Sequence, residues 1–433
     1  MWKNGLTTHI RNSSLGVALA ISLTAALVTS IRTSAQEQQL AHAGGQRPQR
    51  YTVTDLGTLG GTISFGVGIN NKGWTAGFST LPGDQSQHAF LWRNGKVTDL
   101  GTLGGPNSES SFSPFSERGD VGGGAETLTP DPNGENFCGF GTGLSCRPVL
   151  WQDAVITALP TLGGYNGVAN QVNNRGQVVG VAESETLPPA CLQGLAEPVV
   201  WEKGQIQDLH MFPGDSAGVA LAINDKGEAA GFSATCTTFH ALLWRNGTIT
   251  DLGSLGGLIS SASAINNWGQ IVGGSGLPGD TTSHAFLWQD GNMVDLGTLP
   301  GDFSSAAIGI NNKTQVVGVS SDINQNSRAF LWERGVMTDL NSLIPADSPW
   351  FVTEADSINS RGEIVGGAFN MTTGETHGIL AIPCDERNVE DAGCSEKDTS
   401  SGRGETGERP NLALTENIRR LLWQRRFGSL QPK

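Results

Sequence analysis

Short runs of small and apolar residues, separated by turns rich in glycine and asparagine, fill most of this 433-residue chain. In one clear stretch, four runs of strand length follow one another at residues 260–265, 270–274, 284–288 and 292–296. Turn residues bound each run, which is typical of β-strands. Asp290-Gly291 suits a two-residue hairpin, as Asn94-Gly95 and Asn246-Gly247 do elsewhere. The pattern therefore predicts four short antiparallel strands, consecutive in the chain.

This four-strand unit recurs seven times. A tryptophan ends the third run in six copies, and the last four lie 43 or 44 residues apart: Trp92, Trp151, Trp201, Trp244, Trp288 and Trp332. A fixed period in the forties is typical of propellers and solenoids. Four antiparallel strands per unit favour the propeller, whereas a solenoid would need capping units at its ends.

The two ends of the repeat region complement each other. Residues 52–56 copy a fourth strand, residues 96–100, whereas the last repeat stops at a third strand, residues 378–382. We expect residues 51–56 to complete the last blade by pairing with residues 378–382, because ring closure covers exposed sheet edges. The predicted fold is an all-β, seven-bladed β-propeller of four-stranded blades, spanning residues 51–383.

The predicted propeller also indicates where two kinds of side chain lie. Small residues of the first strands are predicted to line the central channel, as at residues 67–70, 219–224 and 307–311. The repeated tryptophans are expected to fill the contacts between neighbouring blades.

Both termini differ from the repeats. Residues 1–35 are predicted to be a secretory signal, because Lys3 and Arg11 precede the apolar residues 15–28 and Ala35 offers a cleavage site. An uncleaved anchor is the alternative; after cleavage we expect no transmembrane anchor. Residues 36–50 and 384–410 are predicted linkers. Residues 411–433 are predicted to be an amphipathic basic tail, which either touches a membrane surface or packs on the ring.

A formal net charge of −14 argues against binding to nucleic acid, which requires a basic face to meet phosphate. Such a charge is typical of a soluble surface, and we expect a monomer. The six cysteines, an even count, suit an extracellular or periplasmic location, where disulfides persist.

The cysteine positions allow a pairing to be predicted from the propeller. Cys138 and Cys146 lie in one long loop, and Cys384 and Cys394 flank one short stretch of the tail. Cys191 and Cys236 each follow a second strand, so adjacent blades would present them on one face. The predicted disulfides are therefore Cys138–Cys146, Cys191–Cys236 and Cys384–Cys394.

The recurring His-Ala-Phe-Leu-Trp at residues 88–92 and 284–288 accompanies Asp-Leu-Gly-Thr-Leu-Gly-Gly and Ile-Asn-Asn-x-Gly. In these motifs residues 51–383 resemble the HAF-repeat family of extracellular proteins. The resemblance implies bacterial export and a repeat fold, and it supplies no activity or catalytic residue. Units two and three depart from it, since Arg147 and Glu197 replace the histidine and Ser116-Glu117-Arg118-Gly119 replaces Asn-Asn-x-Gly.

The repeated histidines are predicted to make one buried hydrogen bond per blade, to aspartates of the fourth strands. The histidines are His88, His240, His284 and His377, and the aspartates are Asp99, Asp251, Asp295 and Asp339. The Pro-Gly-Asp loops end at Asp84, Asp215, Asp280 and Asp302. Each loop offers one carboxylate, so it is predicted to be a turn rather than a calcium site. We expect no metal and no cofactor.

No Gly-x-Ser-x-Gly elbow, Walker loop or His-Glu-x-x-His occurs in the sequence. Glu109, Glu117 and Asp120, in the most deviant unit, are the only candidates for carboxylate chemistry, and no residue is assigned a catalytic role. The connections at residues 126–146 and 183–197 are the longest between second and third strands. They either mark a binding face or reflect the tolerance of surface loops for length.

Two functions are consistent with these features. The first is a secreted, non-enzymatic platform that binds extracellular carbohydrate or protein through the loop face. The second is an extracellular hydrolase or lyase that acts on polysaccharide at the mouth of the channel.

Overall fold

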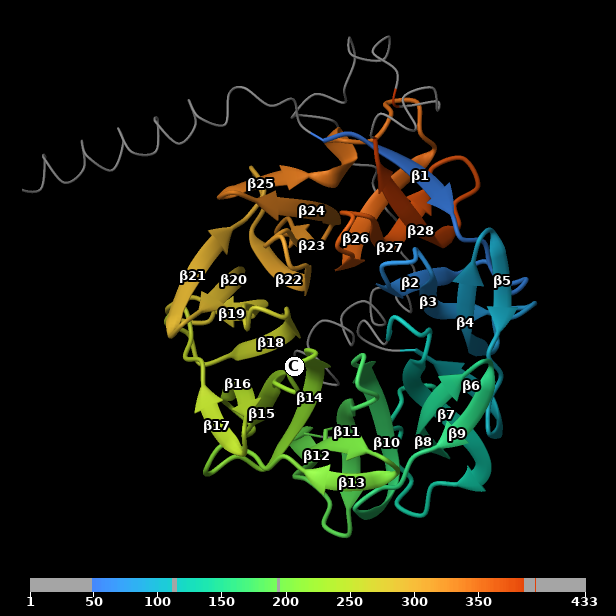
Figure 1. Cartoon of the computed structure of the whole chain (residues 1–433), viewed down its shortest axis with the longest axis vertical. Coiled ribbons are helices and arrows are strands. Elements are labelled where there is room, and N and C mark those ends of the chain that lie inside the picture. The colour runs from blue at the N-terminus through green and yellow to red at the C-terminus, as the bar shows by residue number, and fades with distance from the viewer. Residues whose placement is uncertain (1–48, 111–114, 193–194, 385–393, 395–433) are drawn as a thin grey trace, which may run out of the picture. The chain divides into compact units, whose positions relative to one another are not determined.

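The computed structural model describes residues 49–110, 115–192, 195–384 and 394. The described strands form seven antiparallel sheets of four strands, arranged as blades around a central axis (Figure 1). Two single-turn helices, η1 (Ala190–Leu192) and η2 (Leu340–Ser342), are the helical elements of this part of the chain. The predicted seven-bladed β-propeller is confirmed.

Six blades each consist of four consecutive strands, with the first strand innermost (Figure 1). The first two blades are β2 (Ser64–Ile69), β3 (Thr75–Thr80), β4 (Gln87–Arg93) and β5 (Lys96–Asp99), then β6 (Gly104–Glu109), β7 (Val121–Pro130), β8 (Leu144–Gln152) and β9 (Val155–Ala158). The third and fourth are β10 (Gly163–Val172), β11 (Val178–Ser184), β12 (Glu197–Glu202) and β13 (Gln205–Asp208), then β14 (Ala217–Ile223), β15 (Ala229–Ala234), β16 (Phe239–Arg245) and β17 (Thr248–Asp251). The fifth and sixth are β18 (Ser260–Ile265), β19 (Ile271–Gly276), β20 (Ser283–Gln289) and β21 (Asn292–Gly297), then β22 (Ser304–Ile310), β23 (Val316–Ser321), β24 (Ser327–Glu333) and β25 (Val336–Asp339).

The seventh blade is built from both ends of the repeat region. It contains β26 (Trp350–Ile358), β27 (Ile364–Asn370), β28 (Thr376–Pro383) and, as its outer strand, β1 (Tyr51–Asp55). β1 pairs with β28 in a continuous register from Tyr51 opposite Pro383 to Asp55 opposite Ile379. The predicted closure by the N-terminal strand is therefore confirmed.

The alternation of strand direction gives the ring two different faces. Turns between first and second strands, and hairpins between third and fourth strands, end on one face, which we call the turn face. Connections between second and third strands, and crossings from one blade to the next, end on the other, which we call the loop face. The long connections at β7–β8 and β11–β12 lie on the loop face.

A glycine in every second strand allows it to approach a kinked first strand. The register shifts within each first–second strand pair. A Cβ atom on the glycine there would lie between 1.9 Å and 2.1 Å from a first-strand carbonyl oxygen. The residues are Gly77, Gly123, Gly180, Gly231, Gly273, Gly318 and Gly366. Any larger residue at these positions would push the two inner strands apart.

The repeated tryptophans lie between blades, as predicted. Trp151, which is buried, packs with Leu91 and Leu100 of the preceding blade and donates its indole N–H to the Leu100 carbonyl at 2.8 Å. Trp201 and Trp244 make the same bond to the crossing that precedes their own blades. These bonds satisfy the one polar atom of each indole within an otherwise apolar contact.

Three disulfides join the predicted cysteine pairs: Cys138–Cys146, Cys191–Cys236 and Cys384–Cys394. Such bonds are typical of proteins in oxidising extracellular or periplasmic compartments. Within the described ranges, none of the helices has the length and apolar character needed to cross a membrane. The predicted signal at residues 1–35 and the predicted tail at residues 411–433 lie outside the described residues.

Candidate functional site

In six blades the first strand leads into a turn whose asparagine side chain hydrogen-bonds both to the backbone of its own turn and to the next blade. Asn224 shows the arrangement: its Oδ1 accepts hydrogen bonds from the backbone N–H groups of Lys226 and Glu228, both at 3.0 Å. Its Nδ2 donates to the carbonyl of Asn266 in the following blade at 3.1 Å. The same bond between blades is made by Asn70, Asn173, Asn266, Asn311 and Asn359. These bonds connect the turns around the axis, and Ser116 takes the asparagine's place in the second blade.

The next residue of each turn forms a second polar ring, inside the first. Asn71 donates its backbone N–H to Glu117, Asn174 donates to Asp225, and Asn267 donates to Asn312. Ser360 donates to Oδ1 of Asn71 at 2.8 Å, which joins the last blade to the first. We call this set the inner ring; its members are Asn71, Glu117, Asn174, Asp225, Asn267, Asn312 and Ser360.

The inner ring lines a cavity of about 170 Å³ at the axis, open on the turn face. All seven blades contribute to its wall. The residue before each asparagine or serine adds an apolar band: Ile69, Phe115, Val172, Ile223, Ile265, Ile310 and Ile358. First strands therefore line the channel at this end of the ring, as predicted. The prediction that their small residues do so was wrong here, because isoleucine, valine and phenylalanine side chains form the band.

The two carboxylates of the inner ring are held by neighbouring amides. Burial alone would raise the pKa of Asp225. Hydrogen bonds from the Asn174 backbone and from the Asn267 and Asn174 side chains, together with the Arg175 charge, outweigh burial and lower that pKa below its ordinary value of 3.8. Asp225 is therefore ionised at neutral pH. The cavity thus offers fixed amide, hydroxyl and carboxylate groups above an apolar band, a combination suited to a polar ligand with an apolar face.

We expect Asn224→Ala to lower the free energy of unfolding by about 2–3 kcal/mol, because it leaves two partly buried backbone donors without their acceptor and removes the bond to the next blade. Asn312→Ala is the matched control. Asn312 is exposed and accepts one bond, so we expect a loss below about 1 kcal/mol. Urea unfolding measures both values, and an equal loss in the two variants would contradict the structural role of the first asparagine.

The three carboxylates singled out from the sequence do not form a site together. Glu117 lines the cavity, whereas Asp120 is buried and binds Arg118 at 2.9 Å and the Ser116 hydroxyl at 2.9 Å. Glu109 accepts from the Gln87 side chain at 3.4 Å. They therefore present no pair of carboxylates on either side of a substrate-sized space.

The repeated histidines do bind aspartates, with two corrections. His88–Asp99 and His284–Asp295 are the predicted pairs, at 2.9 Å and 3.0 Å, and His377 binds Asp55 of β1 at 3.0 Å. The prediction that these bonds are buried was wrong, since the aspartate side chains are between 39% and 43% exposed. They lie at the outer strand, where solvent reaches the carboxylate.

The second correction concerns the partners in the fourth and sixth blades. His240 binds Asp215 at 2.9 Å rather than Asp251, because the Phe-Pro-Gly-Asp loop brings the Asp215 carboxylate against the imidazole. The Asp215 side chain is only 1% exposed to solvent. Asp339 binds Arg328, which stands in the histidine position.

The Pro-Gly-Asp loops are turns, as predicted, and the aspartate side chain of the first of them also accepts hydrogen bonds from residues in or beside neighbouring strands. The backbone N–H of Asp84 donates to the Leu81 carbonyl at 2.9 Å, and its carboxylate accepts from Thr62 and Thr80. Among the described residues, no group of three or more histidine, cysteine, aspartate or glutamate side chains is placed to hold a metal ion.

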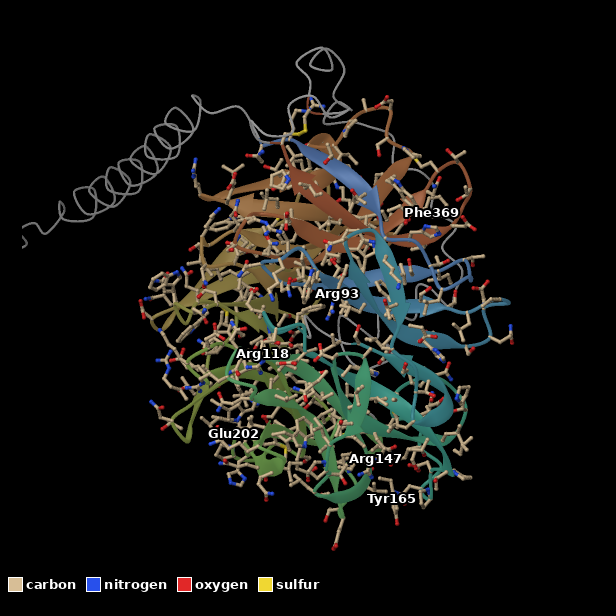
Figure 2. All side chains as sticks on the ribbon, turned by 45° about the vertical axis from the view of Figure 1, so that its right-hand side comes forward. Arg93, Arg118, Arg147, Tyr165, Glu202 and Phe369 are labelled. Atoms are coloured by element: carbon tan, nitrogen blue, oxygen red, sulfur yellow. A yellow bond between two sulfur atoms is a disulfide. The ribbon has the colours of Figure 1, made fainter. Side chains whose placement is uncertain are left out.

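Sequence reasoning missed a cluster of carboxylates on the loop face of the second and third blades. Asp131 and Glu183 are each less than 7% exposed, and Glu135 lies beside them. Asn166, which is fully buried, donates to Asp131 and to Glu183. Arg147 donates to the Tyr165 carbonyl at 3.4 Å, and the two residues lie side by side at this edge of the ring (Figure 2). The cluster could not be foreseen, because its members come from two blades and a long loop.

Burial, followed by the neighbouring Glu183 and then Asp131, raises the pKa of Glu135 to about 7. Between pH 4.5 and 7 the folded protein therefore keeps a proton that the unfolded chain releases, so this group lowers stability as the pH rises through that window. We expect Glu135→Gln to melt like the wild type at pH 4.5 and at a higher temperature at pH 8. Glu185→Gln, an exposed control in the adjacent loop, should show no such difference. Equal curves for Glu135→Gln and wild type at pH 8 would contradict the raised pKa.

Neither a protein-family model nor a curated protein matches this chain. Solved structures match it at low identity. The acylaminoacyl peptidase of Pyrococcus horikoshii is 11% identical, with a TM-score of 0.39, over 72% of this chain and 58% of that one. The puromycin-hydrolyzing peptidase of Mycobacterium tuberculosis is 11% identical, with a TM-score of 0.42, over 76% and 56%. The match thus spans less than two thirds of either peptidase.

The β-propeller domain of the Trilobed protease from Pyrococcus furiosus is also 11% identical, with a TM-score of 0.33, over 64% of this chain and 98% of that domain. At these identities the likeness concerns the fold alone.

Proposed function

We propose that this protein is a non-enzymatic carbohydrate-binding propeller, exported from a bacterial cell and similar in its repeats to the HAF-repeat proteins. The observation that carries the proposal is the cavity at the axis, where seven turns present amide, hydroxyl and carboxylate groups in fixed positions. Sugar hydroxyls both donate and accept hydrogen bonds. Amides and hydroxyls can serve as donors and acceptors for them, and carboxylates as acceptors.

Two further features support a sugar as the ligand. The apolar band beneath the inner ring can contact the C–H face of a pyranose, while the polar groups bind its edge. Trp268 stands on the fifth-blade turn at the rim of the cavity, with its side chain 70% exposed. Its indole N–H donates to the Asn312 carbonyl at 2.9 Å, which holds the ring across the rim as a surface for stacking.

The cavity volume sets the size of the bound group. Pockets that enclose a drug-sized ligand measure about 300–1,000 Å³. A cavity of about 170 Å³ is smaller, so we expect it to admit one sugar residue at the end or side of a chain. We therefore propose binding on the turn face, rather than on the loop face named in the sequence-based prediction.

A polysaccharide hydrolase is the alternative, favoured by the raised pKa of Glu135. Glycoside hydrolysis needs two carboxyl groups about 5 Å apart or more, with the sugar between them. Glu135 instead hydrogen-bonds with Glu183, and Glu183 is buried and occupied by Asn166 and backbone donors. This cluster therefore supports hydrolysis less well than the central cavity supports binding.

Calorimetric titration with soluble polysaccharides, followed by chromatography of the same samples, tests the proposal. We expect binding without release of oligosaccharide. Trp268→Ala and Asn312→Ala should each weaken binding, the tryptophan variant by at least about tenfold. Tyr165→Ala, which removes a 45% exposed aromatic ring on the loop face, is the matched control and should bind normally. Loss in Tyr165→Ala alone would move the site to the loop face, and released oligosaccharide would favour the hydrolase.

A further inference from the structure

One position of the turn face is basic in almost every blade. The third residue of the turn, directly after the inner ring, is lysine or arginine in six blades and Trp268 in the other. We call these residues the collar: Lys72, Arg118, Arg175, Lys226, Trp268, Lys313 and Arg361. All seven are exposed. Six cations around one opening are unexpected in a chain with 41 acidic residues against 27 basic ones.

The three arginines of the collar are held in place by the neighbouring turn. Each guanidinium lies over the glycine of the next blade, where a Cβ atom would be 3.2 Å or less from Nη2. The pairs are Arg118 with Gly176, Arg175 with Gly227 and Arg361 with Gly73. Arg118 also donates to the Asn174 carbonyl at 3.2 Å, and Arg361 donates to the Asn71 carbonyl. The arginines therefore follow the circumference of the opening rather than extending into solvent.

The lysines of the collar retain charge that no described carboxylate neutralises. Lys226 and Lys313 form no ion pair with another residue in the described ranges, and Lys72 lies over the Trp74 ring at 4.6 Å. Arg118 and Arg361 bind Asp120 and Glu363, while Arg175 binds the neutral Gln177. Against the six collar cations stand four carboxylates: Asp120 and Glu363 in these ion pairs, and Glu117 and Asp225 of the inner ring. The rim of the cavity is therefore net positive on a protein whose overall charge is negative.

We propose that the ligand of the central cavity is an acidic polysaccharide, bound by one sugar residue in the cavity and by its carboxylate or sulfate groups on the collar. This inference rests on the proposed carbohydrate-binding function. The inner ring matches hydroxyl groups, Trp268 matches a sugar face, and the collar matches anionic groups repeated along a chain. A neutral glycan would leave the cations unused.

Binding to matched glycans tests this inference. The acidic probes are oligogalacturonate and dextran sulfate; the neutral ones are fully methyl-esterified oligogalacturonate and dextran. The test variant is Lys226→Gln/Lys313→Gln, which leaves the packed arginines intact. The control is Lys96→Gln/Lys203→Gln, which removes the same charge from exposed hairpins on the same face. We expect at least one acidic probe to bind more tightly than its neutral partner. The collar variant should lose about fivefold for that probe and the control less than twofold.

The outcomes separate the inference from the function on which it rests. Equal binding of acidic and neutral partners would overturn the inference and leave carbohydrate binding intact. No binding to any glycan would overturn both. Equal losses of affinity in the collar and control variants would show a general effect of charge, and would overturn the claim that the collar binds the anionic groups. Binding of single-stranded DNA as tight as that of the acidic glycans, with the same loss in the collar variant, would replace the polysaccharide with a nucleic acid.

Discussion

Deletion of residues 36–57 is expected to abolish the stable propeller, with a loss of more than about 5 kcal/mol in the free energy of unfolding. This deletion removes β1 and exposes the edge of β28. Tyr51 is fully buried in the core of the last blade, and Leu56 is 2% exposed in the contact between the last and first blades. Typical domains are stable by only about 5–15 kcal/mol, so the remaining chain should melt far below the intact one or not fold.

The control is deletion of residues 36–48, which keeps β1 and its pairing with β28. We expect this shorter deletion to melt like the chain that begins at residue 36. Circular dichroism during heating distinguishes the two. If both deletions melted together, the N-terminal strand would not close the ring.

Removal of the disulfide between the third and fourth blades should give the second largest effect. Cys191 and Cys236 are separated by 45 residues, and the loop-entropy relation gives about 4 kcal/mol for a loop of that length. We expect Cys191→Ser/Cys236→Ser to lose about that much stability, as measured by chemical unfolding under non-reducing conditions.

Cys384→Ser/Cys394→Ser is the matched control, because these residues are only 10 apart and follow the last strand. The same relation gives about 2.7 kcal/mol for this shorter loop. A larger loss in the control than in the cross-blade variant would contradict the entropic account. Non-reducing peptide mapping should first show each pair, and a peptide joining Cys146 to Cys191 would contradict the pairing itself.

The architecture was predictable because each of its features recurs. The hairpin dipeptides, the tryptophan period and the copied strand at residues 52–56 all specify four-stranded blades and a shared last blade. The cross-blade disulfide followed from that ring, since Cys191 and Cys236 occupy corresponding connections of adjacent blades.

The site was harder to predict, because its chemistry depends on which residues of a repeat face the axis. Ile-Asn-Asn-x-Gly was visible as a motif, but only the ring shows that its first asparagine bonds to the next blade and its second lines a cavity. A signal for the collar was present in the sequence: the variable position of this motif is basic in six of seven copies. Glu135 and Glu183 carried no such signal, since tertiary folding alone brings their carboxylates together.

Hydrogen–deuterium exchange with and without an acidic oligosaccharide tests the central claim most directly. If the ligand binds at the axis, the amides of the seven turns should exchange more slowly in the complex, including those at residues 69–74, 223–228 and 265–270. The connections at residues 131–143 and 185–192 should exchange at unchanged rates. Protection of those connections, with unprotected turns, would contradict a binding site in the central cavity and place it on the loop face.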